Sequence, residues 1–470
     1  MPRPLLLAGA PSAGTSAVTL HAPWDGRALD AIAQAGPAEM EAAAAAAARA
    51  FAVTRAMPAW RRADVLRKVA LGLAARREEI AGLIRDEGGK PITFARAEVS
   101  RAIDTFNLSA EEASRIEGEV FGLDGVAAGE GRTAIVRRFP RGPVLAIAPF
   151  NFPLNLVAHK VAPAIAAGCP VVIKPAEATP SAALVLGELC VEAGWPAEAI
   201  SVLPCDRSVA GALVDDPRFP VISFTGSDVV GWQLRARAPR KQVLLELGGN
   251  AAAIVEPDAD LAYAIPRIAA GGFAHAGQVC ISVQNVLVHE RVFAEARERM
   301  IAAAAAVPRG DPARDATVCG PMINPGQADR VESWVAEAVS GGANAHGGGR
   351  EGSVLAPIVL DSVPDGARIL RDEAFGPVLA MRSYRTLDEA IAYVNAGRFG
   401  LQCGVFTRDV GALFRAFSGL EVGGVIHDDY PTFRVDAMPY GGVKDSGVGR
   451  EGPRWAIRDF TEERLLVLKG

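Results

Sequence analysis

The hydrophobic positions of the chain follow two different periods. Between residues 40 and 120, apolar side chains recur every three or four positions, as Leu66, Val69 and Leu73 do. This spacing places them on one face of a helix, so the segment is predicted to be helical. The alanine-rich run at 41–51 fits the same prediction, because alanine has the highest helix propensity.

Beyond residue 140, short continuous apolar runs alternate with helical stretches. Strands separated by helices indicate a parallel sheet with helices on both faces. Strands are predicted at 144–147, 171–173, 200–203, 221–224 and 243–247, with helices at 154–167 and 181–193.

The same alternation begins again after Gly249, which predicts a second α/β unit. A chain of 470 residues is also too long for one ordinary core. An apolar strand at 465–468 has no partner nearby in the sequence, as is typical of a strand that completes a sheet elsewhere or in a second copy. Strands are predicted at 251–255, 285–289 and 354–359, with helices at 260–273 and 292–305.

Composition and charge exclude several classes of protein. Half of the residues are hydrophobic, 22% are charged and the net charge is −5, which is the balance of a soluble globular protein. No basic surface argues for a nucleic acid or an anionic membrane as partner. The N-terminal apolar run is too short for a signal peptide, and no stretch reaches the ~18 apolar residues of a membrane span.

Six cysteines are scattered along the chain without a CxxC pair or the histidine spacing of a metal site. They predict reduced thiols in a cytoplasmic protein, with no disulfide and no bound metal. Cys280, at the end of a Gly-Gln-Val-Cys segment, follows Glu246 by 34 residues. A cysteine nucleophile needs a base to release its covalent intermediate, and this pair of segments supplies both groups. Taken alone, a free cysteine is more often an inert core residue.

Three further segments follow predicted strands, at the edge where open α/β sheets bind ligands. Asn151, between two phenylalanines, is placed either to donate to an oxyanion or to form a turn. Lys174 and Glu177 can bind ribose hydroxyl groups or form a surface salt bridge. The residues 225–227 open a helix, so they either face a phosphate or cap that helix. His275 lies five residues before Cys280, a spacing that does not share a helix face, so a structural role is expected.

Together these segments resemble the aldehyde dehydrogenase superfamily, nearest its lactaldehyde and phosphonoacetaldehyde dehydrogenase branch. The likeness follows the family's motif order through most of the chain, and the segments 155–160 and 429–440 carry the resemblance to that branch. The matching motifs are PFNFP at 149–153, KPAE at 174–177, FTGS at 224–227, ELGGN at 246–250, GQVC at 277–280, EAFGP at 373–377 and PYGG at 439–442.

The resemblance implies an α/β fold of two doubly wound α/β domains with a small bridging β element. The element would support a homodimer or homotetramer. A discontinuous NAD-binding domain would occupy residues 1–121 and 141–248, and the catalytic domain residues 249–436. The bridging element would comprise residues 122–140 and 461–470.

The resemblance also implies catalytic roles. Cys280 would attack an aldehyde carbon as a thiolate, while the Asn151 side chain and the Cys280 N–H group hold the oxyanion. Hydride transfer to NAD would leave a thioester on Cys280, and Glu246 would activate the water that releases the acid. Relatives that pass the acyl group to coenzyme A usually lack this glutamate, so a non-acylating enzyme is expected.

The cofactor residues follow from the same resemblance. Lys174 and Glu177 would bind the adenosine ribose and Glu373 the nicotinamide ribose, with Phe375 near the nicotinamide. A carboxylate repels a 2′-phosphate, so NAD is expected over NADP, although use of NADP stays open. The other residues assigned to this site are Ala148, Pro149, Phe150, Ala176, Phe224, Thr225, Gly226, Ser227, Val230, Leu247 and Gly248.

The substrate is the open question. Asn107 and Asn285 stand where relatives that oxidise phosphonate or phosphate aldehydes tend to place arginines, and asparagine cannot replace that charge. His159 and Arg434 are the residues that can compensate. A small polar aldehyde is therefore expected, with a phosphonate-bearing aldehyde such as phosphonoacetaldehyde as the alternative. The competing functions are a cofactor-independent cysteine hydrolase or esterase and a non-catalytic binding protein.

Overall fold

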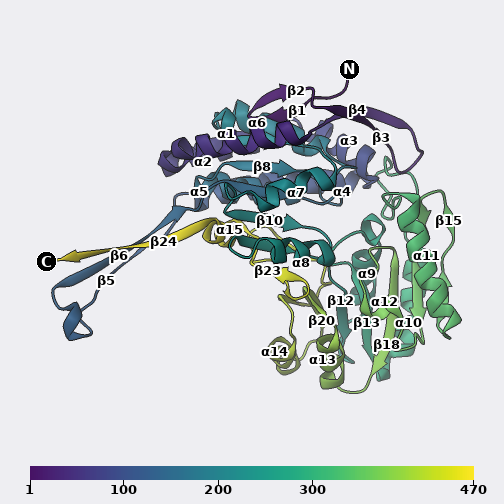
Figure 1. Ribbon diagram of the computed structural model, residues 1–470. Coiled ribbons are helices and arrows are strands. Elements are labelled where there is room, and N and C mark those ends of the chain that lie inside the picture. The colour runs from purple at the N-terminus through teal and green to yellow at the C-terminus, as the bar shows by residue number, and fades with distance from the viewer.

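The computed structural model describes residues 1–470 and contains two large β-sheets in separate parts of the molecule (Figure 1). The first sheet has eight strands in the order β2-β1-β9-β8-β7-β10-β11-β23, of which the five from β9 to β11 are parallel. Its strands are β1 (Leu5–Leu7), β2 (Ala10–Ser12), β7 (Val144–Ile147), β8 (Val171–Lys174), β9 (Ile200–Val202), β10 (Val221–Thr225), β11 (Gln242–Glu246) and β23 (Gly447–Val448).

Helices cover both faces of this sheet, as predicted. In β7, Val144 and Ala146 pack into one apolar cluster and Leu145 into another, because successive side chains of a strand point to opposite faces. Helices α2 to α6 contribute residues to the first cluster, as do α1 and the later helix 453–460, and helices α1, α7 and α8 contribute residues to the second. The helices are α1 (Pro37–Ala56), α2 (Ala59–Ala75), α3 (Arg77–Gly88), α4 (Ile92–Glu112), α5 (Asn155–Ala167), α6 (Ser181–Glu192), α7 (Arg207–Asp215) and α8 (Asp228–Arg237).

The second sheet has seven strands in the order β14-β17-β18-β13-β12-β20-β21, all parallel except β14. Its strands are β12 (Ala251–Val255), β13 (Val283–His289), β14 (Asn344–Gly347), β17 (Ile358–Asp361), β18 (Val378–Tyr384), β20 (Gln402–Phe406) and β21 (Gly424–His427). Its helices are α9 (Leu261–Phe273), α10 (Glu290–Ala305), α11 (Pro325–Ser340), α12 (Arg368–Arg371), α13 (Leu387–Ala396) and α14 (Val410–Gly419).

One predicted strand is wrong. The segment 354–359 is two strands, β16 (Val354–Leu355) and β17, which belong to different sheets. The break falls at Pro357, which has no N–H group to donate to a strand ladder. The chain therefore leaves the small β15–β16 sheet, where β15 spans Arg350–Glu351, before it enters the large one.

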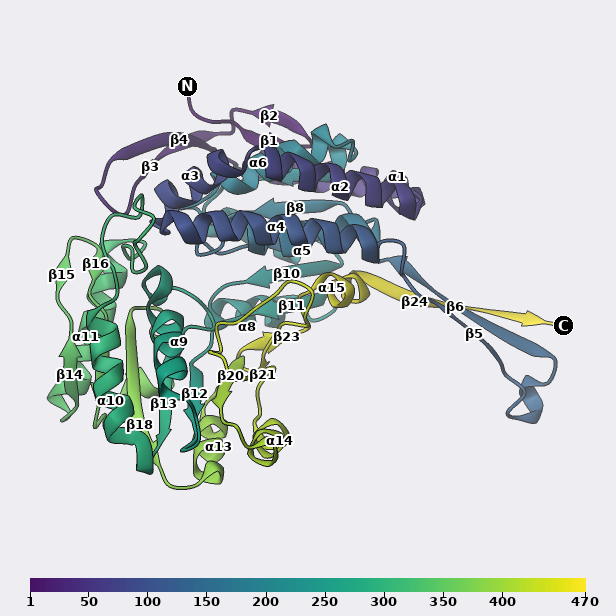
Figure 2. The same cartoon turned by 180° about the vertical axis from the view of Figure 1, so that it is seen from behind.

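A long three-stranded arm projects from the body and ends at the C-terminus (Figures 1 and 2). It pairs β24 (Thr461–Lys469) with β6 (Arg132–Pro140), and β6 with β5 (Glu119–Gly122). The terminal strand predicted at 465–468 thus finds its partner more than 300 residues earlier in the chain. Leu465, Leu466, Val467 and Leu468 are all exposed on this arm.

The chain crosses between the two large sheets twice. Residues 247–250 lead from β11 to β12, and after β21 the chain returns so that β23 pairs with β11, with Gly447 opposite Glu246. The end of β11 therefore lies where both parts of the molecule meet. The proposed domain boundaries stay a prediction. The remaining elements are β3 (Ser16–His21), β4 (Ala28–Gln34), β19 (Phe399–Gly400), β22 (Val443–Lys444) and α15 (Pro453–Phe460). None of the helices is both long and apolar enough to cross a membrane.

Candidate active site

A strained turn delivers Cys280 to the region between the two sheets. His275, Ala276 and Gly277 follow one another with φ of 52°, 54° and 69°, a left-handed conformation that costs non-glycine residues about 1–2 kcal/mol each. A Cβ atom at Gly277 would lie 2.1 Å from the carbonyl oxygen of Gly376, so only glycine fits there. Such strain is kept where the surroundings fix the backbone, and it is common at functional sites.

Gln278 provides part of that fixation. Its Nε2 donates to the carbonyl oxygens of His275 and Pro321, each at 3.2 Å, and its Oε1 accepts from the N–H group of Ile323 at 2.9 Å. His275 is buried and no hydrogen bond joins it to Cys280, in line with the structural role expected for it.

Cys280 differs from the other five cysteines. They are fully buried, whereas Cys280 is partly exposed. Its Sγ lies 2.8 Å from Oη of Tyr440. Burial of the sulfur raises the pKa of the Cys280 thiol to about 11, although the hydrogen bond with Tyr440 and the positive charge of Arg434 favour the thiolate. The one partly exposed cysteine is therefore also the one whose sulfur has a hydrogen-bond partner and a cation in its surroundings.

Asn151 connects the loop after β7 to the Cys280 loop. Its Nδ2 donates to the carbonyl oxygen of Gln278 at 2.9 Å, and the residue is buried. An amide nitrogen carries two hydrogens, so one stays available for a second acceptor. The sequence left a turn as the alternative role of Asn151. In the structure its side chain contacts Gln278, two residues before Cys280.

The buried ion pair of Lys90 and Glu98 holds the loop that carries Asn151. Glu98 on α4 accepts through Oε1 from the N–H groups of Leu154 and Asn155, at 2.9 and 3.1 Å, and through Oε2 from Lys90. Both charged side chains are almost completely buried, and Lys90 Nζ lies 3.5 Å from the ring centroid of Phe152. The negative Glu98 therefore fixes the start of α5 and with it the loop that carries Asn151.

Glu246 ends β11 as a buried carboxyl group with a free oxygen. Its Oε2 is fully buried and has no hydrogen-bond partner. Burial, and next the negative charge of Glu451, raise the pKa of Glu246 well above its usual value, while Arg434 and Lys160 oppose this shift. A Cβ atom at Gly441 would lie 2.7 Å from Oε1, so a glycine is required beside this carboxyl group.

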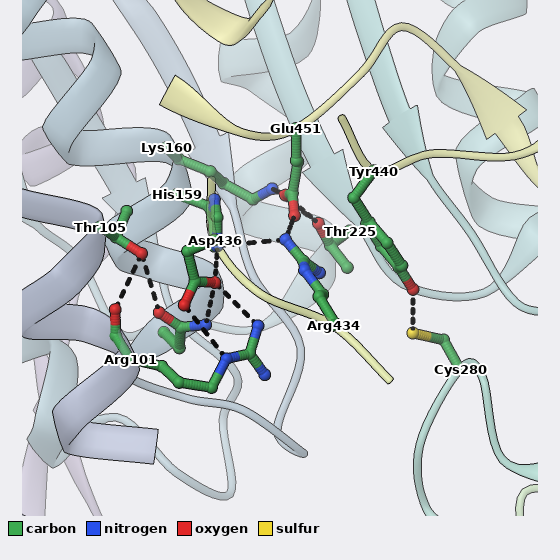
Figure 3. A network of polar contacts seen from close by, with 11 residues as sticks. Arg101, Thr105, His159, Lys160, Thr225, Cys280, Arg434, Asp436, Tyr440 and Glu451 are labelled. Carbon is green, nitrogen blue, oxygen red and sulfur yellow. Dashed lines mark hydrogen bonds and ion pairs between the residues drawn. The ribbon is translucent and has the colours of Figure 1, made fainter. Parts of the chain in front are cut away.

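Glu451 is the centre of a buried charge network (Figure 3), and its negative charge acts on Glu246. Glu451 accepts from Lys160 Nζ at 3.2 Å and from Arg434 Nη2 at 2.8 Å. Lys160 also donates to Oγ1 of Thr225 at 2.6 Å. The Thr225 side chain is therefore turned into the network and does not cap α8, so the capping interpretation of this residue is wrong.

Asp436 forms the second half of the network. It accepts from Arg101 at 2.8 Å, from Asn155 Nδ2 at 3.3 Å and from His159 Nε2 at 2.7 Å. Burial raises the pKa of Asp436, but the bonds from His159 and Arg101 outweigh it and lower the pKa overall. Burial, together with the charge of Arg434, lowers the pKa of His159, so its ring is neutral at pH 7.

The four substrate candidates lie in different places. His159 and Arg434 lie together, with Nε2 and Nη2 3.1 Å apart, and His159 Nδ1 and Arg434 Nε are buried without partners. Asn107 is exposed on α4 and takes no part in this network. Asn285 is buried in β13, where it donates to Asn250 and accepts from Tyr393. Its partners are Asn250, just before β12, and Tyr393 on α13, so the structure does not bring Asn285 to His159 and Arg434.

The cofactor candidates line the carboxyl edge of the first sheet. Neighbouring parallel strands β8, β7, β10 and β11 end here, and Lys174 Nζ lies 3.3 Å from Oε1 of Glu177. Ser227 precedes α8, but its side chain makes no capping bond, so the first N–H groups of α8 have no side-chain partner. The strand ends supply Ala148, Pro149, Phe150, Lys174, Ala176, Glu177, Phe224, Thr225, Gly226, Ser227, Leu247 and Gly248, and α8 supplies Val230.

Glu373 and Phe375 approach this edge from the second half of the chain. The rings of Phe150 and Phe375 meet edge to face with centroids 5.9 Å apart. Glu373 accepts from the N–H group of Gly249 at 3.1 Å, and a Cβ atom at Gly248 would lie 2.2 Å from Glu373 Oε2. Burial raises the pKa of Glu373 to about 8. Strand ends, an uncapped helix start and a carboxyl acceptor together fit a dinucleotide.

Comparison with known proteins identifies the family. The model of the aldehyde dehydrogenase family matches residues 10–466. The chain belongs to the aldehyde dehydrogenase family. It is 45% identical over 411 residues to 3-sulfolactaldehyde dehydrogenase of Priestia aryabhattai, covering 87% of this chain and 86% of that protein.

Solved structures agree with this assignment. Aldehyde dehydrogenase 21 from Physcomitrella patens, in complex with the reaction product succinate, superimposes with a TM-score of 0.98 at 43% identity, covering 100% of this chain and 99% of that one. NADP-dependent glyceraldehyde-3-phosphate dehydrogenase from Bacillus halodurans, complexed with NADP, gives a TM-score of 0.97 at 34% identity, covering 100% and 99%. The predicted family and α/β fold are confirmed.

For several residues of this aldehyde dehydrogenase site, the sequence did not indicate which contacts they make. Lys160 and Glu451 are 291 residues apart, and nothing in either segment indicates their pairing. Tyr440 was part of a matching motif, yet its position in that motif did not indicate the contact with Cys280. The role of Asp436 as an acceptor likewise depends on the fold, which brings Arg101 on α4 and His159 on α5 against the loop after β21.

The buried ion pair of Lys90 and Glu98 predicts how one substitution changes the stability of this aldehyde dehydrogenase. Changing Glu98 to Gln leaves the Lys90 ammonium buried without a counter-charge, so we expect the free energy of unfolding to fall by about 3–5 kcal/mol. Denaturant unfolding of both proteins measures this loss. The matched control is Asp64→Asn, which breaks the exposed ion pair with Lys68 and changes stability little. Equal effects of the two substitutions would contradict the assignment.

Proposed function

We propose that the chain oxidises a small polar aldehyde to its carboxylic acid with NAD(P), through a thioester on Cys280. One observation carries the proposal. The only partly exposed cysteine contacts Tyr440 at 2.8 Å, and a Cβ atom at the next residue, Gly441, would lie 2.7 Å from Oε1 of Glu246, whose other oxygen is buried without a partner. A thiol nucleophile and a carboxyl group that accepts a proton once it is ionised are what acyl transfer to water requires.

In the proposed reaction, the Cys280 sulfur forms a bond to the aldehyde carbon, and the carbonyl oxygen becomes an oxyanion. The free N–H of the Asn151 amide and the backbone N–H group of Cys280 donate to that oxygen. A bound nicotinamide would supply the acceptor for the hydride that leaves the same carbon. Glu246 then takes a proton from water, the water oxygen bonds to the carbon, and the carbon–sulfur bond breaks to release the acid and the thiolate.

The proton on Glu246 sets a pH dependence for this last step. A general base works only when ionised, and burial raises the pKa of Glu246. Acid release is therefore expected to speed up as the pH rises through that pKa. The same glutamate favours transfer of the acyl group to water over transfer to coenzyme A.

We propose NAD as the preferred cofactor. Glu177 places a half-exposed carboxylate beside Lys174, where an added 2′-phosphate would be repelled. Lys174 can offset part of that repulsion, and a similar solved structure holds NADP, so the preference is expected to be one of degree. Initial rates at matched NAD and NADP concentrations measure it.

The substrate proposed is a small aldehyde with an anionic group at its far end. Two observations support it. Arg434 presents a buried Nε without a partner next to neutral His159, and a cation of this kind binds an anionic oxygen. The proteins similar to this chain include one named for 3-sulfolactaldehyde and one crystallised with succinate, which both carry an anionic group. A phosphonate-bearing aldehyde stays the alternative.

This proposal predicts how the enzyme ranks aldehydes. We expect kcat/KM with NAD to be about tenfold or more higher for 3-sulfolactaldehyde and succinate semialdehyde than for uncharged lactaldehyde, because one charge-assisted bond is lost with the latter. Phosphonoacetaldehyde belongs in the same series. The Arg434→Lys variant should slow every aldehyde, because Arg434 also favours the Cys280 thiolate, but it should slow the anionic aldehydes most and so reduce their advantage over lactaldehyde. If lactaldehyde gave the highest kcat/KM of the series in both the wild-type enzyme and the variant, the anionic-substrate proposal would be wrong.

We also propose a cytoplasmic homodimer or homotetramer built on the three-stranded arm. The exposed leucines and valine of β24 supply an apolar surface that a second copy would cover, and six free thiols suit a reducing compartment. The molar mass of the purified chain in solution distinguishes these assemblies from a monomer.

Cys280→Ala tests the nucleophile. We expect NADH production from every aldehyde to fall by a factor on the order of 10⁴ or more, because no other group can form the covalent intermediate. Cys403→Ala is the matched control, since Cys403 is fully buried in β20, and it should keep wild-type turnover. Ester hydrolysis by the wild-type enzyme without cofactor, as fast as the NAD-linked reaction, would instead support a cysteine hydrolase.

Glu246→Gln tests the release step. The variant should still form the thioester, but water attack should slow by about 10²–10⁴-fold because the proton acceptor is gone. Intact mass measured after mixing with aldehyde and NAD should show the acyl group on Cys280. Glu78→Gln, a change at an exposed carboxylate, serves as control and should show no adduct. Rapid release without an adduct in Glu246→Gln would remove Glu246 from this role.

A further inference from the structure

The hydroxyl group of Tyr440 is the side-chain group that shares a hydrogen bond with the Cys280 sulfur, and the proposed reaction gives it no part. Its Oη lies 2.8 Å from Sγ, and Figure 3 shows the ring pointing from its loop toward the thiol. The tyrosine is buried, with 2% of its surface exposed. The contact is therefore shielded from water that would otherwise compete for the sulfur.

The direction of this hydrogen bond follows from the charges around it. Burial, and next the nearby Cys280, raise the pKa of Tyr440 well above its usual value, so the phenol keeps its proton. A thiolate can only accept, so the O–H group is the donor once Cys280 has ionised. The charged groups that act on the sulfur are Arg434, which favours the thiolate, and Glu373 and Glu246, which oppose it when ionised.

The phenol ring is held in place on two sides. The backbone N–H group of Tyr440 donates to the Glu451 carbonyl oxygen at 3.1 Å, and the Glu451 N–H group donates back at 2.6 Å. The guanidinium carbon of Arg434 lies 3.7 Å from the ring centroid, and the Glu451 carboxylate fixes that guanidinium. A cation over the ring face draws electron density from it, which makes the hydroxyl group a stronger donor.

We propose that Tyr440 is a further catalytic residue, which donates a hydrogen bond to the Cys280 thiolate and stabilises it before the aldehyde arrives. This inference rests on the proposed role of Cys280 as nucleophile. The thiol proton leaves to solvent, the phenol keeps its own, and no electrons are transferred. When sulfur bonds to the aldehyde carbon it loses its charge, so the bond from Tyr440 weakens as the reaction proceeds.

The Tyr440→Phe variant tests this in the cofactor-free enzyme, with alkylation by iodoacetamide followed by intact mass. Loss of a bond to a charged acceptor should lower the thiolate fraction about tenfold, and the freed thiolate should be about threefold more nucleophilic. Across pH 7–9 we therefore expect alkylation to be about threefold slower. Cys280→Ala identifies the signal, since the other five cysteines are buried.

The sign of the effect separates this role from a structural one. A loosened site would expose the sulfur and speed alkylation, whereas a lost donor slows it at an unchanged melting temperature. Tyr393→Phe removes a phenol hydroxyl group elsewhere in the second part of the molecule and should alkylate at the wild-type rate. A Tyr440→Phe rate equal to or above wild type overturns the inference.

Replacement of all five tyrosines by 3-fluorotyrosine gives a second test that keeps the side-chain shape. Its more acidic phenol donates more strongly, so alkylation should be faster than in the unmodified enzyme, and a slower rate contradicts the proposal. These readouts need neither aldehyde nor NAD. The Tyr440 proposal can therefore fail in the alkylation experiments while Cys280 is still the nucleophile. The role of Cys280 is judged separately, by the effect of Cys280→Ala on NADH production.

Discussion

The site depends on the ion pairs that the buried Glu451 carboxylate forms with Lys160 and Arg434. The carboxylate accepts from Lys160 on α5 and from Arg434 on the loop that returns from the second sheet. An isolated charge at this depth would be too costly to keep, so the two cations are needed for the carboxylate to exist there. Their attraction outweighs burial and lowers the pKa of Glu451, and its negative charge in turn pushes Glu246 toward the protonated form. The ionised Glu451 thus adds to the effect of burial, which is the larger cause of the raised pKa of Glu246.

The geometry of the nucleophile comes from backbone constraints. Three residues in a left-handed conformation turn the chain before Cys280, and Gln278 fixes the turn through three hydrogen bonds. The Asn151 amide reaches the same turn from the loop after β7. The loop of Asn151 is itself held by Glu98, so hydrogen bonds link α4 through this loop to the turn before Cys280.

Sequence patterns predicted the parts of this enzyme that depend on local order. Continuous apolar runs marked the parallel strands, and Asn151, Glu246 and Cys280 stood out because each lies at a strand end or in a family motif. Contacts between distant segments gave no such signal. The bond between Tyr440 and Cys280 spans 160 residues and exists only because the chain returns to the first sheet. Thr225 was open between two roles for the same reason, since Lys160 decides its orientation. The break at Pro357, by contrast, was readable from the residue type alone.

The three-stranded arm has a consequence for how the energy of this fold is distributed. Along β24, Leu465 and Val467 point to one face and Leu466 and Leu468 to the other, and all four are exposed. A ribbon that is apolar on both faces gains little from its own three strands. In the proposed oligomer, the energy that orders it comes from association. The free energy of unfolding then depends on the protein concentration. Each tenfold dilution lowers it by about 1.4 kcal/mol per dimer. The stability of the active site becomes in part a property of how much enzyme the cell contains.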